Sequence, residues 1–378
     1  MSVNYLGIAL VLNCGSSSVK YQVVDTTLDQ PLATGLIERV TNHTAAIGDV
    51  IARLRAPGSG VDLDALTVVG HRVVQGGAEF SAPTIVTDEV EHKIALLSTL
   101  APLHTPPNLA GITAARAAFP HLPHVVVFDT AFHSTLPEAA YTYAIDRRVA
   151  HAHGIRRYGA HGTSHSYVSR ELARLMDRDV RDINSIVLHL GNGASACAVR
   201  GGLSVETSMG LTPLEGLVMG TRSGDIDPAV VFHLSRTAGM TIDEIDTLLN
   251  RHSGMLGLTG HSDMRDVNDA VDAGDHAAIV GLDVYAHRIR GYIGNYFAQL
   301  GSLDAIAFTA GIGENDSVVR AKSLAGLAGL GIKIDLARNE GRKNGATLIS
   351  ADDSAVQVWV VPTNEEREIA LQSIAAVS

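Results

Sequence analysis

Short apolar runs alternate with longer amphipathic stretches from one end of the chain to the other. The short runs have the length and β-branched character of buried strands and cover Ile8 to Leu12, Tyr21 to Val24, Val68 to Val73, Val125 to Phe128, Ile186 to Leu190, Ile306 to Phe308 and Val356 to Val361. The longer stretches have helical spacing over Ala45 to Leu54, Asn108 to Phe119, Ser166 to Met176, Ile279 to Leu300 and Glu365 to Ala376. This alternation predicts an α/β protein.

The pattern also contains a weak internal repeat. Residues 8–24 read as a strand, a turn of small residues and a second strand, and residues 186–199 repeat that order about Gly191 to Ser195. Either unit alone is typical of an ordinary hairpin. Two units at domain spacing predict a duplicated domain whose turns offer backbone amides to phosphate, with a nucleotide held in the cleft between the halves.

Composition narrows the class of protein. A chain of 378 residues with 46% hydrophobic residues is long enough for two domains with large cores. The net charge of −11, without a block of like charge, argues against a nucleic-acid partner. No apolar run approaches the ~20 residues that cross a bilayer, and no positive segment opens a signal peptide, so no membrane association is expected. Two cysteines, Cys14 and Cys197, suit a reducing cytoplasm.

Two common phosphate-binding signatures are missing. The chain has no GxxxxGK[ST] sequence, and neither Gly191-Asn192-Gly193 nor Gly311-Ile312-Gly313 continues into GxGxxG. The sequence therefore excludes P-loop and Rossmann sites.

Two arginines lie in or beside turns rich in small residues. Arg222 lies within Thr221 to Pro228, and Arg72 precedes Gly76-Gly77. Each alone is typical of a solvated or capping residue. Together they suit the oxygens of a phosphoryl group, because a guanidinium matches phosphate geometry and stays charged.

Two carboxylates lie at the ends of predicted elements, one after a strand and one at the start of a helix. Asp129 ends the strand Val125 to Phe128, where it can act in a site or cap a helix. Thr363 and Glu366 have the spacing of a capping box, which leaves Glu365 free to point into a cleft. Asp129 and Glu365 can hold Mg²⁺ through its waters.

Two further segments suggest chemistry. His161 and His165 have the i, i+4 spacing of half a zinc site, but no HExxH glutamate is present and Gly162 is expected to interrupt any helix. Donation from His161 to a phosphoryl group and a structural histidine remain the alternatives. Phe308 to Asn315 ends a strand in a glycine turn that suits an adenine and ribose platform.

These residues resemble the acetate kinase family, within the acetate and sugar kinase, heat-shock chaperone and actin superfamily. The resemblance covers essentially the whole chain, in segments 13–20, 71–77, 101–108, 128–133, 156–165, 189–195, 221–228, 262–267, 308–315 and 362–366. It implies duplicated ribonuclease H-like domains of the actin-like ATPase type. Residues 1–130 with 365–378 would form one domain and residues 131–364 the nucleotide-binding and dimerisation domain of a homodimer.

The resemblance also implies a reaction and residue roles. The reaction is reversible phosphoryl transfer from ATP to acetate, giving acetyl phosphate and ADP, with a short-chain acyl kinase preferring propionate as the alternative. Asn13 and Glu365 would lie at Mg²⁺, which Mn²⁺ can replace. The catalytic residues would be Arg72, Asp129, His161 and Arg222. Substrate would meet Arg72, Val74, Leu103 and Pro213. Nucleotide would meet Lys20, His189, Leu190, Gly191, Asn192, Gly193, Asp263, Met264, Arg265, Gly311, Ile312, Gly313, Glu314 and Asn315.

Three residues depart from the family pattern. Gln75 stands where His is usual, Ala160 stands where Phe precedes the catalytic His, and Glu206 stands where Asp is usual. Only Ala160 is expected to touch the acyl pocket. A chaperone or actin-like ATPase would need a peptide-binding or polymer-forming region, for which no segment remains. A sugar kinase would need a proton acceptor and a polar pocket, whereas Val74, Leu103 and Pro213 are apolar.

Overall fold

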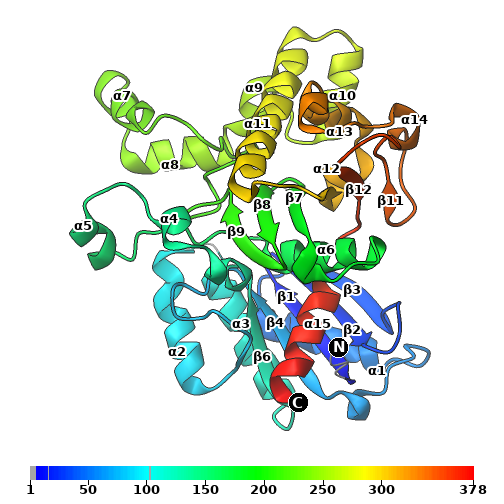
Figure 1. Cartoon of the computed structure of the whole chain (residues 1–378). Helices are drawn as coiled ribbons and strands as arrows, with labels where there is room; N and C mark the ends of the chain where they lie inside the picture. The colour runs from blue at the N-terminus through cyan, green and yellow to red at the C-terminus, as the bar shows by residue number, and fades with distance from the viewer. Residues whose placement is uncertain (1–5, 16, 102–103) are drawn as a thin grey trace. The chain divides into compact units, whose positions relative to one another are not determined.

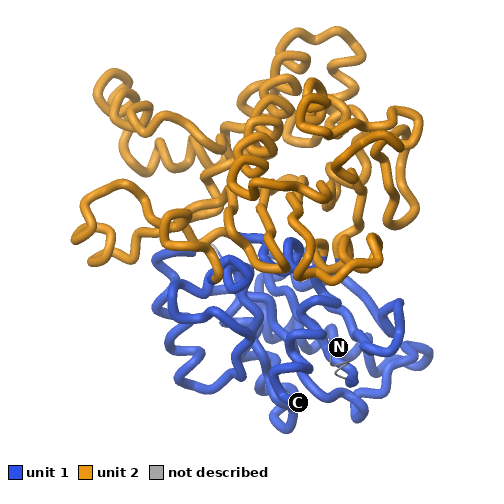
Figure 2. Tube along the Cα trace, in the orientation of Figure 1, with its two compact units in different colours: residues 1–134, 160–167, 364–378 blue, residues 135–159, 168–363 orange. Residues whose placement is uncertain are grey.

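The computed structural model describes residues 6–15, 17–101 and 104–378, which form two compact units (Figures 1 and 2). Unit 1 contains residues 1–134, 160–167 and 364–378, and unit 2 contains residues 135–159 and 168–363. The sequence interpretation assigned all of residues 131–364 to the second domain. In the structure, residues 160–167 group with unit 1, because the N–H of Gly162 donates to the carbonyl of Asp129 at 2.9 Å.

Unit 1 is built on a mixed six-stranded sheet in the order β3-β2-β1-β4-β6-β5. Its strands are β1 (Ile8–Cys14), β2 (Ser18–Asp25), β3 (Ala33–Glu38), β4 (Val68–Val73), β5 (Thr84–Ile85) and β6 (His124–Phe128). The first three strands are antiparallel neighbours, whereas β1, β4 and β6 run parallel. The carboxyl ends of β1, β4 and β6 therefore lie at one edge of the sheet, which is where α/β proteins place their sites.

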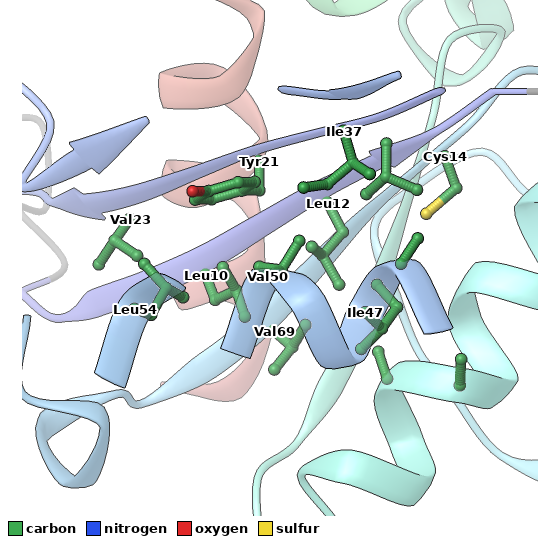
Figure 3. Packing of buried hydrophobic residues seen from close by; sticks show 14 of the residues in the cluster. Leu10, Leu12, Cys14, Tyr21, Val23, Ile37, Ile47, Val50, Leu54 and Val69 are labelled. Carbon is green, nitrogen blue, oxygen red and sulfur yellow. The ribbon is translucent and has the colours of Figure 1, made fainter. Parts of the chain in front are cut away.

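Alternate residues of the central strands face two different helical layers. Leu10 and Leu12 pack with α1 (His43–Arg55) and α3 (Thr105–Ala118) in the cluster of Figure 3. Ala9 and Val11 point to the other face of β1 and pack against α15 (Glu365–Val377). Burial on both faces explains why these strands read as continuous apolar runs rather than as alternating ones.

Unit 2 repeats this plan in a sheet ordered β11-β12-β10-β7-β8-β9. Its strands are β7 (Asn184–Leu190), β8 (Ala194–Arg200), β9 (Leu203–Thr207), β10 (Ala305–Thr309), β11 (Thr347–Leu348) and β12 (Gln357–Val360). Strands β7, β8 and β9 are antiparallel neighbours like β1, β2 and β3, and β10 joins β7 in parallel as β4 joins β1. The predicted duplication of an α/β domain is confirmed.

The remaining helices complete both units. They are α2 (Asp88–Leu96), α4 (Glu138–Tyr141), α5 (Arg147–Ala152), α6 (Gly162–Leu175), α7 (Ala229–Thr237), α8 (Ile242–Arg251), α9 (Gly254–Thr259), α10 (Met264–Asp272), α11 (His276–Leu300), α12 (Ala310–Asn315), α13 (Ser317–Leu324) and α14 (Leu336–Asn339). The long helix α11 contacts β7 and β8. In the described part of the chain, no helix is long and apolar enough to cross a membrane.

The predicted strands and helices are all present, but two local predictions are wrong. Gly162 does not interrupt a helix, since it is the first residue of α6. The cap of α15 is Asn364 rather than Thr363, because the Asn364 side chain accepts the N–H of Arg367 at 3.0 Å. Glu366 is therefore free of capping and forms an ion pair with Lys20 at 2.5 Å.

The tight contact between α3 and β1 yields a stability prediction. A Cβ atom added at Gly111 would lie 2.3 Å from Sγ of the buried Cys14. We expect Gly111→Ala to lower the free energy of unfolding by about 1–3 kcal/mol, the usual cost of overpacking. Denaturant titration followed by circular dichroism measures this change.

Gly48→Ala is the matched control, because Gly48 lies in α1 with no atom within 4 Å of an added Cβ. We expect it to raise the free energy of unfolding by about 0.5–1 kcal/mol, since alanine is the better helix former. Equal effects of the two substitutions would contradict the close packing of α3 on β1.

Candidate active site

The turn between β1 and β2 is closed by backbone bonds. The N–H of Gly15 donates to the carbonyl of Ser18 at 2.8 Å, and Nε2 of His43 lies 2.9 Å from the carbonyl oxygen of Gly15. Asn13 and Lys20 are paired across the two strands, next to this turn. Asn13 thus lies at the end of β1, and the Lys20 ammonium forms its ion pair with Glu366.

Arg72 and Asp129 form an ion pair with two donors at this edge of the unit 1 sheet. They lie on the neighbouring strands β4 and β6 or directly after them, and the N–H of Asp129 continues the ladder by donating to Val73 at 2.9 Å. Arg72 Nε and Nη2 donate to the two oxygens of Asp129 at 3.0 and 2.7 Å. Only 1% of the Asp129 side chain is exposed. This paired geometry holds the guanidinium in one orientation.

Glu365, the first residue of α15, adds a second carboxylate. Its Oε2 atom lies 3.8 Å from Arg72 Nε, and the Thr163 hydroxyl lies 3.4 Å from both Glu365 Oε2 and Asp129 Oδ1. Burial and the neighbouring Asp129 charge raise the pKa of Glu365 despite the opposing effect of Arg72. Burial alone would lower the pKa of Arg72, but the carboxylates around it raise that pKa. Two carboxylates therefore share one guanidinium.

The segment that carries His161 is fixed against the end of β6. His161 adopts a left-handed backbone with φ of +56°, and a Cβ added at the following Gly162 would lie 2.2 Å from the carbonyl oxygen of Asp129. Nε2 of His133 lies 2.9 Å from the carbonyl oxygen of the buried Ala160. Glycine at position 162 is thus required for the close approach that brings His161 and Thr163 beside Asp129.

The predicted acyl contacts fall in different parts of the structure. Val74 follows Arg72 by two residues, and its N–H donates to the Asn108 side chain at 3.3 Å. The Asn108 amide also donates to the carbonyl of Cys14 at 2.7 Å, so it joins the ends of β1 and β4. Pro213 lies in unit 2, and Leu103 is outside the described residues.

Arg222 lies in unit 2 beside the turn that joins β7 and β8. Its Nη1 donates to the carbonyl of Pro213 at 2.7 Å, and the nearby N–H of Gly220 donates to the carbonyl of Asn192 at 3.0 Å. Across the described residues, no carboxylate forms an ion pair with Arg222. Burial lowers the pKa of this guanidinium. A partly buried cation that lacks a carboxylate is suited to bind an anion.

A cavity of about 850 Å³ lies within unit 2. Eight predicted nucleotide contacts line it, namely Gly191, Asn192, Asp263, Met264, Arg265, Gly311, Ile312 and Asn315. Six residues that the sequence analysis missed also line it, namely Ser262, Asn268, Asp316, Ser317, Val318 and Arg342. The size, the glycine turns and the mixture of charges suit a nucleotide.

The other predicted nucleotide contacts do not line this cavity. Leu190 is fully buried in the unit 2 core, and His189 is almost as buried. Glu314 points elsewhere, since its Oε1 accepts the N–H of Thr363 at 3.2 Å. Gly193 pairs with Gly191 inside the turn, and Gly313 is buried. Lys20 lies in unit 1.

The three departures from the family pattern also have defined positions. Gln75 is buried, and its side-chain oxygen accepts the N–H of Gly77 at 2.9 Å. Glu206 lies 3.9 Å from Arg157 in unit 2, and burial raises its pKa. Ala160 alone of the three precedes His161 directly, on the segment fixed beside Asp129.

Comparison with known proteins gives concordant matches over nearly the whole chain. The model of the Acetokinase family matches residues 8–52 and 38–371. A protein of Leifsonia xyli named acetate kinase is 58% identical, with 98% of each chain covered. The crystal structure of Porphyromonas gingivalis acetate kinase has a TM-score of 0.94 at 38% identity and covers 98% of this chain and 100% of its own.

A propionate kinase from Francisella tularensis is also similar, with a TM-score of 0.91 at 40% identity, and the match covers 97% of this chain and 99% of that one. The duplicated sheets, the grouping of Arg72 with Asp129 and Glu365, and these full-length matches lead to one conclusion: the chain belongs to the acetokinase family.

Proposed function

We propose that the chain transfers the γ-phosphoryl group of ATP reversibly to acetate, giving acetyl phosphate and ADP. The observation that carries this proposal is the Arg72 guanidinium, held by Asp129 and Glu365 at one edge of the unit 1 sheet. A guanidinium fixed in this way matches the planar oxygens of a carboxylate or a phosphoryl group. The names of the full-length relatives, acetate kinases of bacteria, support the same reaction.

The nucleotide is assigned to the cavity of unit 2. Backbone amides of the Gly191 to Gly193 turn and of the short helix α12, which carries Gly311 and Ile312, would contact phosphate and ribose, and Asp263 and Arg265 would provide polar side chains. His189, Leu190 and Lys20 remain predicted contacts that would need a different arrangement from the one described. Arg222 would bind the transferred phosphoryl group.

Mg²⁺ fits the donor set of unit 1. Asp129 and Glu365 would supply carboxylate oxygens and Asn13 an amide oxygen, and the single charge of Arg72 does not balance the two carboxylates beside it. Within the described ranges, no three His, Cys, Asp or Glu side chains are grouped to enclose a metal ion. Asn13 and Glu365 would therefore hold Mg²⁺ or Mn²⁺ largely through its waters, as is usual beside nucleotide phosphates. When bound, the ion neutralises negative charge on those phosphates.

The chemistry requires positioning more than proton transfer. Acetate is ionised at neutral pH, so its attack on phosphorus needs no base. Both oxygens of Asp129 accept hydrogen bonds from Arg72, which suits an organiser of charge rather than a proton acceptor. Arg72 and Arg222 would bind the acetate carboxylate and the oxygens of the phosphoryl group, and His161 would donate a hydrogen bond in the transition state. Val74, Leu103 and Pro213 would meet the methyl group.

The direct test is ATP-dependent trapping of the acyl phosphate as its hydroxamate. Acetate should yield hydroxamate and ADP in equal amounts, whereas glycerol should consume no ATP. Glycerol phosphorylation would favour a sugar kinase, and peptide-stimulated ATP hydrolysis without hydroxamate would favour a chaperone-like ATPase. Either result would replace the proposed reaction.

A homodimer is proposed as the assembly. Helix α7 has no buried residue in the single chain, and Phe232 and Ile242 on α7 and α8 are 57% and 64% exposed. Exposed apolar side chains gathered on neighbouring helices are typical of subunit interfaces. The cytoplasm is the proposed location, because the reaction uses ATP.

Replacing Asp129 distinguishes the two roles of its carboxylate. If Asp129 organises Mg²⁺, we expect Asp129→Asn to raise the Mg²⁺ concentration for half-maximal activity about tenfold, or ~1.4 kcal/mol, because an amide is a poorer ligand for a hard cation. Steady-state assays across a Mg²⁺ titration measure this shift. A fall in kcat with unchanged Mg²⁺ dependence would instead identify Asp129 as a base.

The electrostatics of Glu365 predict a change in stability without any substrate. The pKa of Glu365 is raised in the folded state, so ionisation of this carboxyl at neutral pH destabilises the fold. The cost disappears as the pH falls, once the carboxyl is protonated in both the folded and the unfolded chain. We therefore expect Glu365→Gln to unfold at a higher temperature than the wild type at pH 7 without Mg²⁺, and the difference to vanish near pH 4. Added Mg²⁺ should stabilise the wild type more than the variant. A less stable variant at pH 7 would contradict this account.

The alanine at position 160 predicts a broad acyl preference. An added buried methylene contributes ~0.8 kcal/mol, and we expect propionate to have a kcat/KM within about tenfold of that for acetate, or ~1.4 kcal/mol. The similarity to a propionate kinase favours testing this alternative. Ala160→Phe should increase the preference for acetate. Kinetics of both proteins on acetate, propionate and butyrate decide the point, and equal discrimination would show that position 160 does not set acyl size.

A further inference from the structure

One fully buried charged side chain has no part in the proposed chemistry. Arg320, on α13, has 0% of its surface exposed and is the largest fully buried side chain of the described residues. In that part of the chain it forms no ion pair with a carboxylate. Burial lowers its pKa to about 10, so the guanidinium is still charged at neutral pH. A charge kept at such a position must be compensated by dipoles, and its contacts show which ones.

The Arg320 guanidinium connects two separate segments. On one side, Nη1 donates to the carbonyl oxygens of Gly313 and Glu314, at 2.9 and 3.0 Å, in the last turn of α12. On the other side, Nε donates to Oδ1 of Asn339 at 2.7 Å and Nη2 donates to its carbonyl oxygen at 2.9 Å. Cations stabilise the carbonyl end of a helix, so α12 supplies part of the compensation.

Asn339 is itself held in place on both sides. It is 3% exposed, and its amide donates to the carbonyl of Ser317 at 2.8 Å. Arg320 and Asn339 therefore form a closed set of hydrogen bonds, which we call the Arg320 lock, between the end of α12, the start of α13 and the end of α14. The three guanidinium nitrogens of Arg320 and the amide oxygen and nitrogen of Asn339 each have a hydrogen-bond partner. A polar network that is satisfied in this way is rigid.

Both segments joined by the Arg320 lock contribute to the wall of the unit 2 cavity. Gly311, Ile312 and Asn315 of α12 line it, and so does Arg342, three residues beyond Asn339. Within the described residues, Arg342 has no hydrogen bond or ion pair of its own. Asp316, at the start of α13, accepts a hydrogen bond from the Asn268 amide at 2.7 Å. This bond connects α10 to the helix that carries Arg320.

We propose that Arg320 is a positioning residue for the nucleotide site, fixing the α12 turn and the segment with Arg342 as one rigid wall, so that Arg342 meets the nucleotide phosphates. This inference rests on the proposed function, since it assumes that the cavity binds ATP. Arg320 itself touches no substrate. Its effect is on nucleotide affinity, through the placement of backbone amides in α12 and of the Arg342 charge.

Arg320→Lys tests the role of the forked guanidinium, because lysine keeps the charge but a single ammonium cannot span both segments. We expect the KM for ATP to rise about tenfold, the KM for acetate to change less than twofold, and the Kd of a fluorescent ADP analogue to rise in parallel. A purely structural role would lower stability or change both KM values together. An unchanged KM for ATP, or an equal rise in both, would overturn the inference.

Two further variants keep the test decisive if Arg320→Lys does not fold. Asn339→Ala removes the Oδ1 acceptor but keeps the carbonyl acceptor, so the KM for ATP should rise about threefold. Arg338→Lys is the matched control, because Arg338 lies next to Asn339 but bonds to Ser350 and Asp352. It should leave both KM values unchanged. Fluorescence of Trp359, the single tryptophan, reports folding of unit 2 in each variant.

A double-substitution cycle tests the role of Arg342. Arg342→Ala alone should weaken ADP more than adenosine, and adding Arg320→Lys should cost less than the sum of the two single effects. Strict additivity would overturn the link between the two arginines. A wild-type protein that binds no ADP analogue would refute the proposed function. If the wild type binds the analogue and Arg320→Lys and Asn339→Ala bind it with the same affinity, only the positioning role of Arg320 is refuted.

Discussion

Two carboxylates, the buried Asp129 and the partly exposed Glu365, share the single charge of Arg72, and the electrostatics at this edge of the unit 1 sheet depend on that imbalance. Asp129 takes the paired donors of the guanidinium, so Glu365 receives only a longer contact. Bringing the second carboxylate out of water costs free energy that one cation does not fully offset. The fold tolerates the cost because β4, β6 and α15 are each fixed by apolar packing that does not depend on these charges. A fold with this arrangement is prepared to accept another cation.

In the part of the chain that the structure describes, two arginines of unit 2, Arg222 and Arg320, are held without carboxylates. Arg222 and Arg320 both bond to backbone carbonyl oxygens, and neither forms an ion pair with a carboxylate in the described residues. Dipoles orient a guanidinium without cancelling its charge, so Arg222 retains its attraction for an anion. The two units thus share a strand order but differ in how the guanidinium groups described here are compensated, by carboxylates in unit 1 and by backbone carbonyls in unit 2.

Some features follow from the sequence because they depend on local patterns. Strands such as β1 and β7 are apolar on both faces and were predictable, whereas the edge strands β3 and β9 mix exposed and buried positions and have no clear pattern. The cap of α15 was mispredicted because Thr363 and Asn364 both have capping side chains, and only the structure shows that the N–H of Thr363 is used by Glu314.

The site residues divide in the same way. Arg72 lies near the end of β4, and Asp129 and Gly191 directly follow β6 and β7, so position along the chain was enough to identify them. Leu190 was placed at the nucleotide because the family resemblance implies contacts from the whole segment 189–193, but β7 is buried on both faces and its last residue, Leu190, lies in the core. Asn108, Asn268 and Arg342 come from helices and loops distant in sequence, and no spacing indicates their partners. Their roles arise from tertiary packing, which a single sequence does not encode in any short pattern.

The place of α15 in the fold has a consequence for how the protein is made. This last helix covers one face of the unit 1 sheet, where Ile369 and Ile374 pack on Ala9 and Val11 of the first strand. It also brings Glu365 to Arg72. During synthesis, β1 leaves the ribosome early and must wait with an exposed apolar face until α15 emerges. A nascent or truncated chain without α15 therefore lacks both the cover of this sheet face and the carboxylate of Glu365 beside Arg72.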